Sequence, residues 1–235
     1  MKSTQKAGEM SPRALAAYID QSVLKPSFTQ DEIRRYIQEG IDYGCKTVCI
    51  NAAALPIARA MCKGTDTGIC VVCDFPFGLS STASKVLQAQ EILAGGGVDD
   101  LDVVVNYGWL RSGMWDEAGA EMRVLTEITH RHGALLKMIF ETDALTLDEV
   151  ARATEIACAA GVDFVKTSTG FYTDGASNGA TPEVIRVMLD AARGRCKVKG
   201  SGGIRDRARF LELIDLGVER MGIGYRSTPV ILGVR

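Results

Sequence analysis

The sequence predicts a (β/α)8 barrel, and three observations support this fold class. First, eight short apolar runs recur along the chain, each separated from the next by about one strand–helix unit. Second, several runs are almost continuously apolar, which is typical of parallel strands buried on both faces. Third, no linker or change of composition divides residues 1–235, so we expect one domain. An open doubly wound sheet is the alternative, and it is disfavoured because no GxGxxG turn follows the first run.

The expected strands are short and follow one another along the whole chain. They lie at residues 18–24, 47–51, 68–75, 100–106, 134–140, 163–168, 196–201 and 220–224. Only residues 225–235 follow the eighth run, and they include Pro229, so the C-terminal end of the barrel is expected to be shortened. The segment SPRALAAY (11–18) precedes the first run and predicts a short N-terminal capping helix.

The intervening helices carry their own start and stop signals. Thr29 with Glu32 and Thr146 with Glu149 have the spacing of capping boxes, and each helix ends near a glycine. Pro182 follows a threonine and takes the first helical position of a third helix. Each helix leads into the next expected strand, as a βα repeat requires.

Composition excludes several classes of function. The chain has 46% hydrophobic and 24% charged residues and a net charge of −2, which gives no electrostatic footprint for nucleic acid or an anionic membrane. No apolar run is long enough to span a bilayer. The start, MKSTQKAGEMSPR, lacks the apolar centre of a signal peptide. We therefore expect a cytoplasmic protein.

Seven cysteines in a cytoplasmic protein are expected to be thiols rather than disulfides. Cys70 and Cys73 form a CxxC motif, but in a strand they point to opposite faces and cannot share a metal ion. His130 and His132 end a helical stretch without an evident acidic or cysteine partner. We therefore expect no metal site and structural thiols, and any role of Cys45, Cys49 and Cys62 beyond packing stays open.

Two lysines carry the strongest chemical signal. Lys166 lies in DFVKTSTGF (163–171) and Lys199 in CKVKGSGGI (196–204), each at the end of an apolar run and one βα unit apart. Burial disfavours the ammonium form of lysine, and a second ammonium nearby disfavours it further. The resulting neutral amine can attack a carbonyl and form a Schiff base. Two strand-end lysines that extend to water are the alternative.

The period of two along each strand brings further charged residues to the same cavity. Lys137 and Asp102, on the fifth and fourth strands, are expected to face inward with Lys166 and Lys199. Asp102 can then keep one lysine charged while Lys166 stays neutral. This difference in protonation makes Lys166 the candidate nucleophile. A purely structural ion pair of Asp102 with Lys137 is the alternative, and for Lys137 it is the favoured interpretation.

Glycine-rich segments follow the sixth and seventh strands. TSTG (167–170) and GSGG (200–203) offer backbone N–H groups that bind anions, and barrels often bind phosphate with the loops after their last strands. The expected substrate or phosphate contacts here are Thr169, Gly170, Ser201, Gly202 and Gly203.

Together these motifs resemble the deoxyribose-phosphate aldolase family, whose members are class I aldolases on a (β/α)8 barrel. The matching stretches cover residues 18–224 in the family's order and include IDQSVLKP (19–26), DFPFG (74–78), LLKMIFET (135–142), FVKTSTGF (164–171) and VKGSGGIR (198–205). The resemblance implies that Lys166 forms the Schiff base, that Lys199 keeps it neutral, and that Asp102 assists proton transfer.

The resemblance also implies the reaction. This is the reversible cleavage of 2-deoxy-D-ribose 5-phosphate to D-glyceraldehyde 3-phosphate and acetaldehyde, in carbohydrate degradation, with no metal or organic cofactor. The expected partners are a small sugar phosphate or aldehyde and further copies of this chain, as a dimer or tetramer. The sequence does not fix the oligomeric state.

Four departures from the family pattern are present. Residues 20–22 read Asp-Gln-Ser where the family usually has Asp-His-Thr, so the acid Asp20 is kept. Asp74 replaces a glycine before FPFG. The tail lacks the terminal tyrosine of some members. After the eighth strand, residues 222–227 read GIGYRS instead of Gly-x-Ser-Ser, whose serines contact phosphate in the family.

This last departure bears on the substrate. Tyr225 could fill the space meant for phosphate, or Arg226 could supply a charged contact together with Gly222 and Gly224. Two alternatives to the family's reaction stay open. One is the same lysine chemistry on a non-phosphorylated or otherwise different sugar or aldehyde. The other is a barrel that binds a phosphorylated ligand without aldol chemistry, and retention of the lysines and Asp102 disfavours it.

Overall fold

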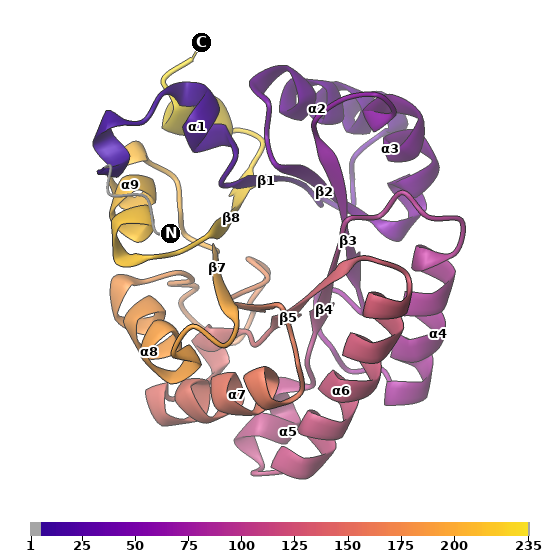
Figure 1. Ribbon diagram of the computed structural model, residues 1–235, viewed down its shortest axis with the longest axis vertical. Helices are drawn as coiled ribbons and strands as arrows, with labels where there is room; N and C mark the ends of the chain where they lie inside the picture. Colours follow the sequence, from indigo (N-terminus) through magenta and orange to yellow (C-terminus); the bar gives the residue numbers. More distant parts are fainter. Residues whose placement is uncertain (1–5, 235) are drawn as a thin grey trace.

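The computed structural model describes residues 6–234, which form a closed barrel of eight parallel strands surrounded by helices (Figure 1). Residues 1–5 and 235, including the first part of the segment MKSTQKAGEMSPR, lie outside the described residues. The strands are β1 (Ile19–Val23), β2 (Thr47–Asn51), β3 (Gly68–Cys73), β4 (Asp100–Val104), β5 (Leu135–Ile139), β6 (Phe164–Lys166), β7 (Lys197–Ser201) and β8 (Arg220–Gly224). Each expected run contains one of them.

The order of strand pairing closes the barrel. Each strand pairs with its neighbours in the chain, and β1 pairs with β8, which excludes the open sheet. The register sets Asp102 beside Lys137, Lys166 beside Lys199, and Lys199 beside Arg220. Charged residues of β4 to β8 are therefore neighbours across the strands.

The helices lie outside the strands, as Figure 1 shows. They are α1 (Pro12–Ala16), α2 (Gln30–Tyr43), α3 (Leu55–Cys62), α4 (Thr82–Leu93), α5 (Tyr107–Arg111), α6 (Trp115–Arg131), α7 (Leu147–Ala159), α8 (Pro182–Ala192), α9 (Arg207–Leu216) and α10 (Thr228–Leu232), with 3-10 turns η1 (Ala7–Glu9), η2 (Ala52–Ala54) and η3 (Thr142–Ala144). Both predicted capping boxes are present, at the starts of α2 and α7, and α8 begins with Pro182 behind the cap of Thr181.

The first and last α-helices lie side by side. The expected N-terminal helix is α1, and it packs against the short C-terminal helix α10 in the outer ring (Figure 1). Leu15 and Ala16 of α1 and Ile231 of α10 are buried in the main hydrophobic core. Five residues of α10 therefore take the place of a longer closing helix.

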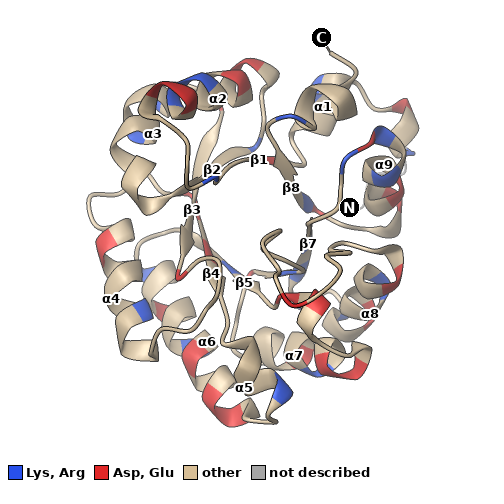
Figure 2. Ribbon diagram, turned by 180° about the vertical axis from the view of Figure 1, so that it is seen from behind, with Lys and Arg blue, Asp and Glu red and all other residues tan. Residues whose placement is uncertain are grey.

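The main hydrophobic core lies between the strands and the helices. It collects the outward-facing side chains of the strands, such as Val48, Val71 and Leu101, and the inner faces of the helices. The interior of the barrel is different, because its buried side chains include carboxylates, lysines and an arginine. Figure 2 shows charged positions on strands of the barrel as well as on the outer helices, where both signs are interspersed.

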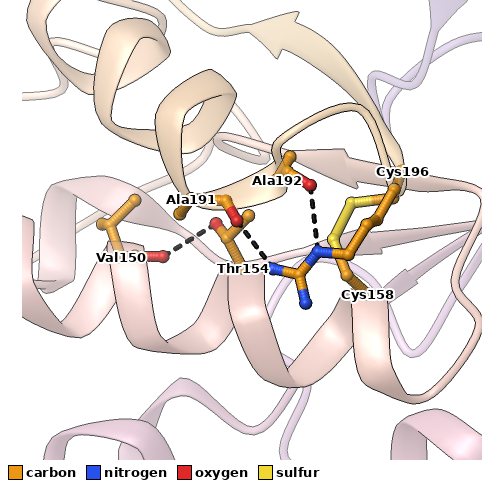
Figure 3. The surroundings of a disulfide bond; sticks show 7 residues. Val150, Thr154, Cys158, Ala191, Ala192 and Cys196 are labelled. Carbon is orange, nitrogen blue, oxygen red and sulfur yellow. Dashed lines mark hydrogen bonds between the residues drawn. A yellow bond between two sulfur atoms is a disulfide. The ribbon is translucent and has the colours of Figure 1, made fainter.

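Cys158 and Cys196 form a disulfide, so the expectation of thiols alone was wrong (Figure 3). Cys158 lies at the end of α7 and Cys196 just before β7, and their Cα atoms are 5.6 Å apart. They are separated by 38 residues, and the packing of α7 against α8 brings them together. That proximity is tertiary and has no local signal in the sequence.

A smaller observation concerns the outer surface. His130 Nε2 lies 2.8 Å from Asp163 Oδ2, so this histidine has an acidic partner that the sequence analysis did not identify. The pairing comes from the docking of α6 beside the start of β6.

Among the helices of residues 6–234, none has both the length and the hydropathy that a membrane crossing requires.

Candidate active site

Asp102 lies at the centre of the barrel and contacts three lysines. Its Oδ2 is 2.8 Å from Lys166 Nζ and 2.7 Å from Lys199 Nζ, and its Oδ1 is 2.9 Å from Lys137 Nζ. All four residues are buried. The period-two prediction is therefore confirmed for their inward orientation, and the two lysines of greatest interest share a single carboxylate oxygen.

A second group of charges supports this centre from the N-terminal side of the barrel. Asp20 Oδ2 is 2.5 Å from Lys199 Nζ, and Asp20 Oδ1 is 2.7 Å from Arg220 Nη1. Asp100 Oδ2 is 2.9 Å from the same Arg220 atom and 2.7 Å from Lys137 Nζ. Thr47 Oγ1 also donates a hydrogen bond to Asp20. Asp100 therefore bridges two cationic side chains, and Asp20 bridges three, since Lys137 Nζ also lies 3.7 Å from its Oδ2.

The charged side chains hold one another in their ionised forms. Burial lowers the pKa of Lys199, but the carboxylates of Asp102 and Asp20 outweigh it, so its pKa lies above the ordinary value. Burial also lowers the pKa of Lys137, but its acidic neighbours, Asp102 above all, raise it above the ordinary value. Burial raises the pKa of Asp20 and Asp102, whereas the neighbouring lysines lower both well below the usual range.

A small apolar group occupies the same interior. Leu24, Cys49, Cys70 and Val72 form a cluster separate from the main core, with Phe75 and Phe171 packed against it. The Phe75 and Phe171 rings meet edge to face with centroids 5.4 Å apart, and Lys166 Nζ lies 6.0 Å from the Phe75 ring. Lys166 therefore has charged neighbours on one side and an apolar wall on the other.

Asp74 holds the loop that carries Phe75. Its backbone is left-handed, with φ of 49°, a conformation that explains why glycine suits this position. Its carboxylate accepts hydrogen bonds from the backbone and hydroxyl of Ser80 and lies 3.6 Å from the buried Lys85 Nζ. These contacts compensate for the unfavourable backbone and fix the direction in which Phe75 points.

The loops after β5, β6 and β7 are joined at the mouth of the barrel. Thr169 donates a short hydrogen bond from its hydroxyl to Glu141, which is buried and left-handed with φ of 55°. Burial raises the pKa of Glu141, against the opposing hydrogen bonds from Thr169. Ala180 N donates to Gly202 O, so the segment after β6 lies against the loop after β7.

The predicted phosphate residues of these loops have different surroundings. Thr169 and Ser201 are buried, and the Thr169 hydroxyl is used by Glu141. Gly170 and Gly203 are exposed, and Gly202 is partly exposed. The N–H groups of Gly202 and Gly203 donate to no other described residue. These two N–H groups are therefore free to receive an anion.

The sequence left two roles open for the residues after β8: Tyr225 filling the space for phosphate, or Arg226 contacting it. The first of these is not observed. The Tyr225 ring stacks on Tyr36 with centroids 3.9 Å apart and meets Phe28 at 5.3 Å, so it packs toward α2 and does not fill the phosphate space. The period of two explains this, because Gly222 and Gly224 face inward and Tyr225 outward. Gly224 is exposed, with open space where a Cβ would stand. Arg226 is exposed, and its guanidinium lies over the Tyr225 ring.

Comparison with known proteins assigns the family. The model of the DeoC/LacD family aldolases matches residues 14–227. The deoxyribose-phosphate aldolase of Mannheimia succiniciproducens is 38% identical over 213 residues, which cover 91% of this chain and 92% of the relative. This chain belongs to the DeoC/LacD aldolase family. The predicted resemblance, the barrel and the assignment to the lyases are thereby confirmed.

Further relatives agree with this assignment. The deoxyribose-phosphate aldolase of Thermococcus kodakarensis is 38% identical over 215 residues, covering 91% of this aldolase and 94% of the relative. The solved structure of the aldolase QR15 has a TM-score of 0.84 at 34% identity, covering 93% and 94% of the two chains. A tetrameric deoxyribose phosphate aldolase from Aeropyrum pernix has a TM-score of 0.84 at 27% identity, covering 95% and 91%.

Sequence reasoning missed two members of the aldolase's charge cluster. Asp100 and Arg220 were not among the predicted site residues, yet each makes two buried ion pairs. The sequence contains patterns that could have identified both residues. Asp100 shares a strand face with Asp102 through the period of two, and Arg220 lies two residues before Gly222 on the last strand. Both stand at the starts of their strands, where stability rather than catalysis is usually expected.

Asp20→Asn is expected to lower the free energy of unfolding of the aldolase by about 3–5 kcal/mol at neutral pH, because it removes one negative charge from a buried cluster of basic side chains and one of the two acidic partners of both Lys199 and Arg220. The folded-state pKa of Asp20 is depressed, so its stabilisation is present above the unfolded value of about 3.9 and is lost as the pH falls toward the folded value.

Urea unfolding at pH 7, 5 and 3.5 checks this prediction. The difference between the wild type and Asp20→Asn should be largest at pH 7 and shrink below about pH 4. Asp66→Asn is the control, because its pair with Arg13 is exposed to solvent and little change is expected. A difference that stayed constant at all three pH values would contradict the role given to the Asp20 charge.

Proposed function

We propose that this aldolase catalyses the reversible cleavage of 2-deoxy-D-ribose 5-phosphate to D-glyceraldehyde 3-phosphate and acetaldehyde, with residues 1–235 acting as one (β/α)8 domain. Lys166 is the Schiff-base nucleophile, and Lys199 and Asp102 are the residues that govern its protonation and the proton transfers. The observation that carries this proposal is the single Asp102 oxygen shared by the Lys166 and Lys199 side chains.

The balance of charge in the cluster supports Lys166 as the neutral amine. The three carboxylates of Asp20, Asp100 and Asp102 face four basic side chains, those of Lys137, Lys166, Lys199 and Arg220. Full ionisation would leave one buried excess positive charge, which is costly.

Lys166 is the basic residue of this cluster with the least compensation. Among the described residues it pairs with one carboxylate, Asp102, whereas Lys199 pairs with two and Lys137 with three. The ammonium group of Lys199 lies beside it on the same Asp102 oxygen, so two like charges would stand close together if Lys166 were also charged.

The proposed reaction uses this neutral amine. Lys166 Nζ attacks the C1 aldehyde of the open-chain sugar, and loss of water gives an iminium ion. The C3 hydroxyl then loses its proton as the C2–C3 bond breaks, which releases glyceraldehyde 3-phosphate and leaves an enamine on Lys166. Protonation at C2 and hydrolysis release acetaldehyde. Asp102 and Lys199 form the hydrogen-bonded network through which these protons move.

Residues at the barrel mouth are proposed to bind the phosphate. The free N–H groups of Gly202 and Gly203 supply donors, and Gly170 and Gly224 have open space where a Cβ would stand. Gly222 is proposed to bring the backbone of β8 close to Ser201, because a Cβ there would lie 3.0 Å from the Ser201 hydroxyl. Arg226 supplies the charge, because its guanidinium is exposed at the end of β8. Thr169 and Ser201 are assigned a supporting role, since both are buried beneath the loops.

A cytoplasmic location and a homodimeric or homotetrameric state belong to the same proposal. Phosphorylated sugars are charged metabolites that are retained inside cells, which supports the location. The tetramer described for the Aeropyrum pernix aldolase supports the larger assembly. Light scattering of the purified chain measures the oligomeric state directly, and a monomer at all concentrations would contradict this part of the proposal.

Arg226→Ala is expected to reduce the preference for the phosphorylated substrate by about tenfold or more. A charge-assisted hydrogen bond is worth about 1.5–3 kcal/mol, and each 1.4 kcal/mol is a factor of ten. The measurement is the ratio of kcat/KM for deoxyribose 5-phosphate to that for free deoxyribose. Arg186→Ala, on the exposed face of α8, is the control and should leave the ratio unchanged.

The same ratio tests the alternative substrate. The altered sequence at the end of β8, with Tyr225 and Arg226 in place of a serine pair, is the feature that favours a non-phosphorylated sugar or aldehyde. A ratio near one in the wild-type aldolase would support that alternative and exclude the phosphate role of Arg226. Absence of cleavage with either sugar would contradict the aldolase proposal itself.

A further inference from the structure

Two cysteines face each other inside the barrel. Cys49 of β2 and Cys70 of β3 are directly opposite in the strand register. Both are free and buried, and they belong to the small apolar cluster beside Lys166. Their sulfur atoms and a carboxylate oxygen of Asp102 lie within 4.8 Å of one another. The pair therefore forms a dithiol in contact with the central carboxylate.

The geometry of neighbouring strands permits a bond between these thiols. Adjacent strands lie about 4.7–4.9 Å apart, and the Cα atoms of disulfides are usually about 4.4–6.8 Å apart. Register-paired residues also project their side chains to the same face of the sheet. Cys73 provides a contrast, because it lies on the opposite face of β3 with its sulfur directed toward Lys85 O.

A metal ion is a weaker interpretation of the same three groups. A divalent cation bound by Cys49, Cys70 and Asp102 would stand among ammonium groups, since Lys137 Nζ is 3.6 Å from Cys70 Sγ and the other two lysines pair with Asp102. A disulfide is uncharged and meets no such repulsion. The positive surroundings thus favour thiol oxidation over metal binding.

We propose that peroxide oxidises Cys49 and Cys70 to a disulfide that reversibly inactivates the aldolase. The Cys49 thiolate attacks hydrogen peroxide, whose O–O bond breaks to give a sulfenic acid and water once the leaving hydroxide takes a proton. Cys70 sulfur then attacks this sulfur, and the hydroxyl leaves as a second water. Both thiols are oxidised, and one peroxide is reduced to two waters. Peroxide is smaller than the aldehyde that has to reach Lys166.

The loss of activity follows from the contact with Asp102. Cys70 Sγ lies 3.1 Å from Asp102 Oδ1, the oxygen that also accepts from Lys137, and the thiol donates to it. A disulfide removes this donor and draws the two strands' side chains together beneath Lys166. The neighbouring Cys70 thiol, and after it the nearby lysines, lower the pKa of Cys49 against the effect of burial, which supports Cys49 as the attacking thiol.

The inference rests on the proposed function only for its activity measurement, because the cross-link is detected separately. Wild-type aldolase is treated with hydrogen peroxide, and peptides are analysed by mass spectrometry without reduction. A Cys49–Cys70 cross-link is expected, with activity falling in proportion to its yield and returning on addition of dithiothreitol. Cys70→Ala should lose both the cross-link and the recoverable part of the inactivation, relative to its own untreated rate.

Two control variants separate this pair from the other cysteines. Cys73→Ala and the double variant Cys158→Ala/Cys196→Ala should respond as the wild type does, because one lacks only the outward-facing thiol of β3 and the other only the existing disulfide. Inactivation without the cross-link, or equal recoverable inactivation in Cys70→Ala, would overturn the proposal. So would a full yield of cross-link with unchanged activity in an aldolase that cleaves its substrate.

Discussion

Lys166→Arg is expected to abolish aldol cleavage, with kcat falling by at least roughly 10⁴-fold. Arginine stays protonated in proteins, so it offers no nucleophile for the carbonyl, although it keeps a positive group near Asp102. Covalent catalysis is a large part of the acceleration of about 10⁶-fold or more that enzymes achieve. The measurement is the rate of acetaldehyde release from deoxyribose 5-phosphate.

Lys197→Arg is the matched control for this variant. Lys197 lies on β7 at the N-terminal end of the barrel, where it is half exposed and pairs with Glu219. Its replacement should leave kcat close to the wild-type value. Substantial activity in Lys166→Arg, in a protein with an unchanged melting temperature, would show that another group is the nucleophile.

Asp102→Asn is expected to lower kcat by about 10²–10⁴-fold, the usual contribution of a general acid–base residue. Asparagine has nearly the same shape but no charge, so Lys137, Lys166 and Lys199 would lose their shared carboxylate. The pH dependence of kcat/KM should also change, because the ammonium group of Lys199 would lose one of its two acidic partners.

Asp100→Asn separates this catalytic role from a structural one. Asp100 is also buried and pairs with Lys137 and Arg220, but it pairs with neither Lys166 nor Lys199. The two variants should lose comparable stability in urea unfolding, while only Asp102→Asn loses most of its activity. If Asp102→Asn unfolded the barrel, or kept a near-normal rate, the purely structural role of Asp102 would be supported instead.

Much of the fold could be predicted because its signals are local. The capping boxes at Thr29 and Thr146 depend on residues three positions apart, and Pro182 directly follows its cap Thr181. All three mark helix starts in the structure. The apolar runs identify strands because parallel strands are buried on both faces. The disulfide between Cys158 and Cys196 had no such signal, since it depends on two segments that meet only in the folded chain.

The site was predictable to the extent that the period of two applies. That period places Asp102, Lys137, Lys166 and Lys199 on inward faces, and the barrel brings them together. The same rule applied to β8 would have turned Tyr225 outward, where it stacks on Tyr36. Arg220 escaped prediction because an isolated arginine at the start of a strand is usually exposed, whereas here two buried carboxylates bind it.

The central claim is that Lys166 is the residue that becomes covalently bound to the substrate. Borohydride reduction in the presence of acetaldehyde, followed by peptide mass spectrometry, tests it most directly. We expect an ethyl group on the Lys166 side chain and its absence in Lys166→Arg. An ethyl group on Lys199 or Lys137 instead, or no adduct under conditions in which the wild-type aldolase is active, would contradict this account.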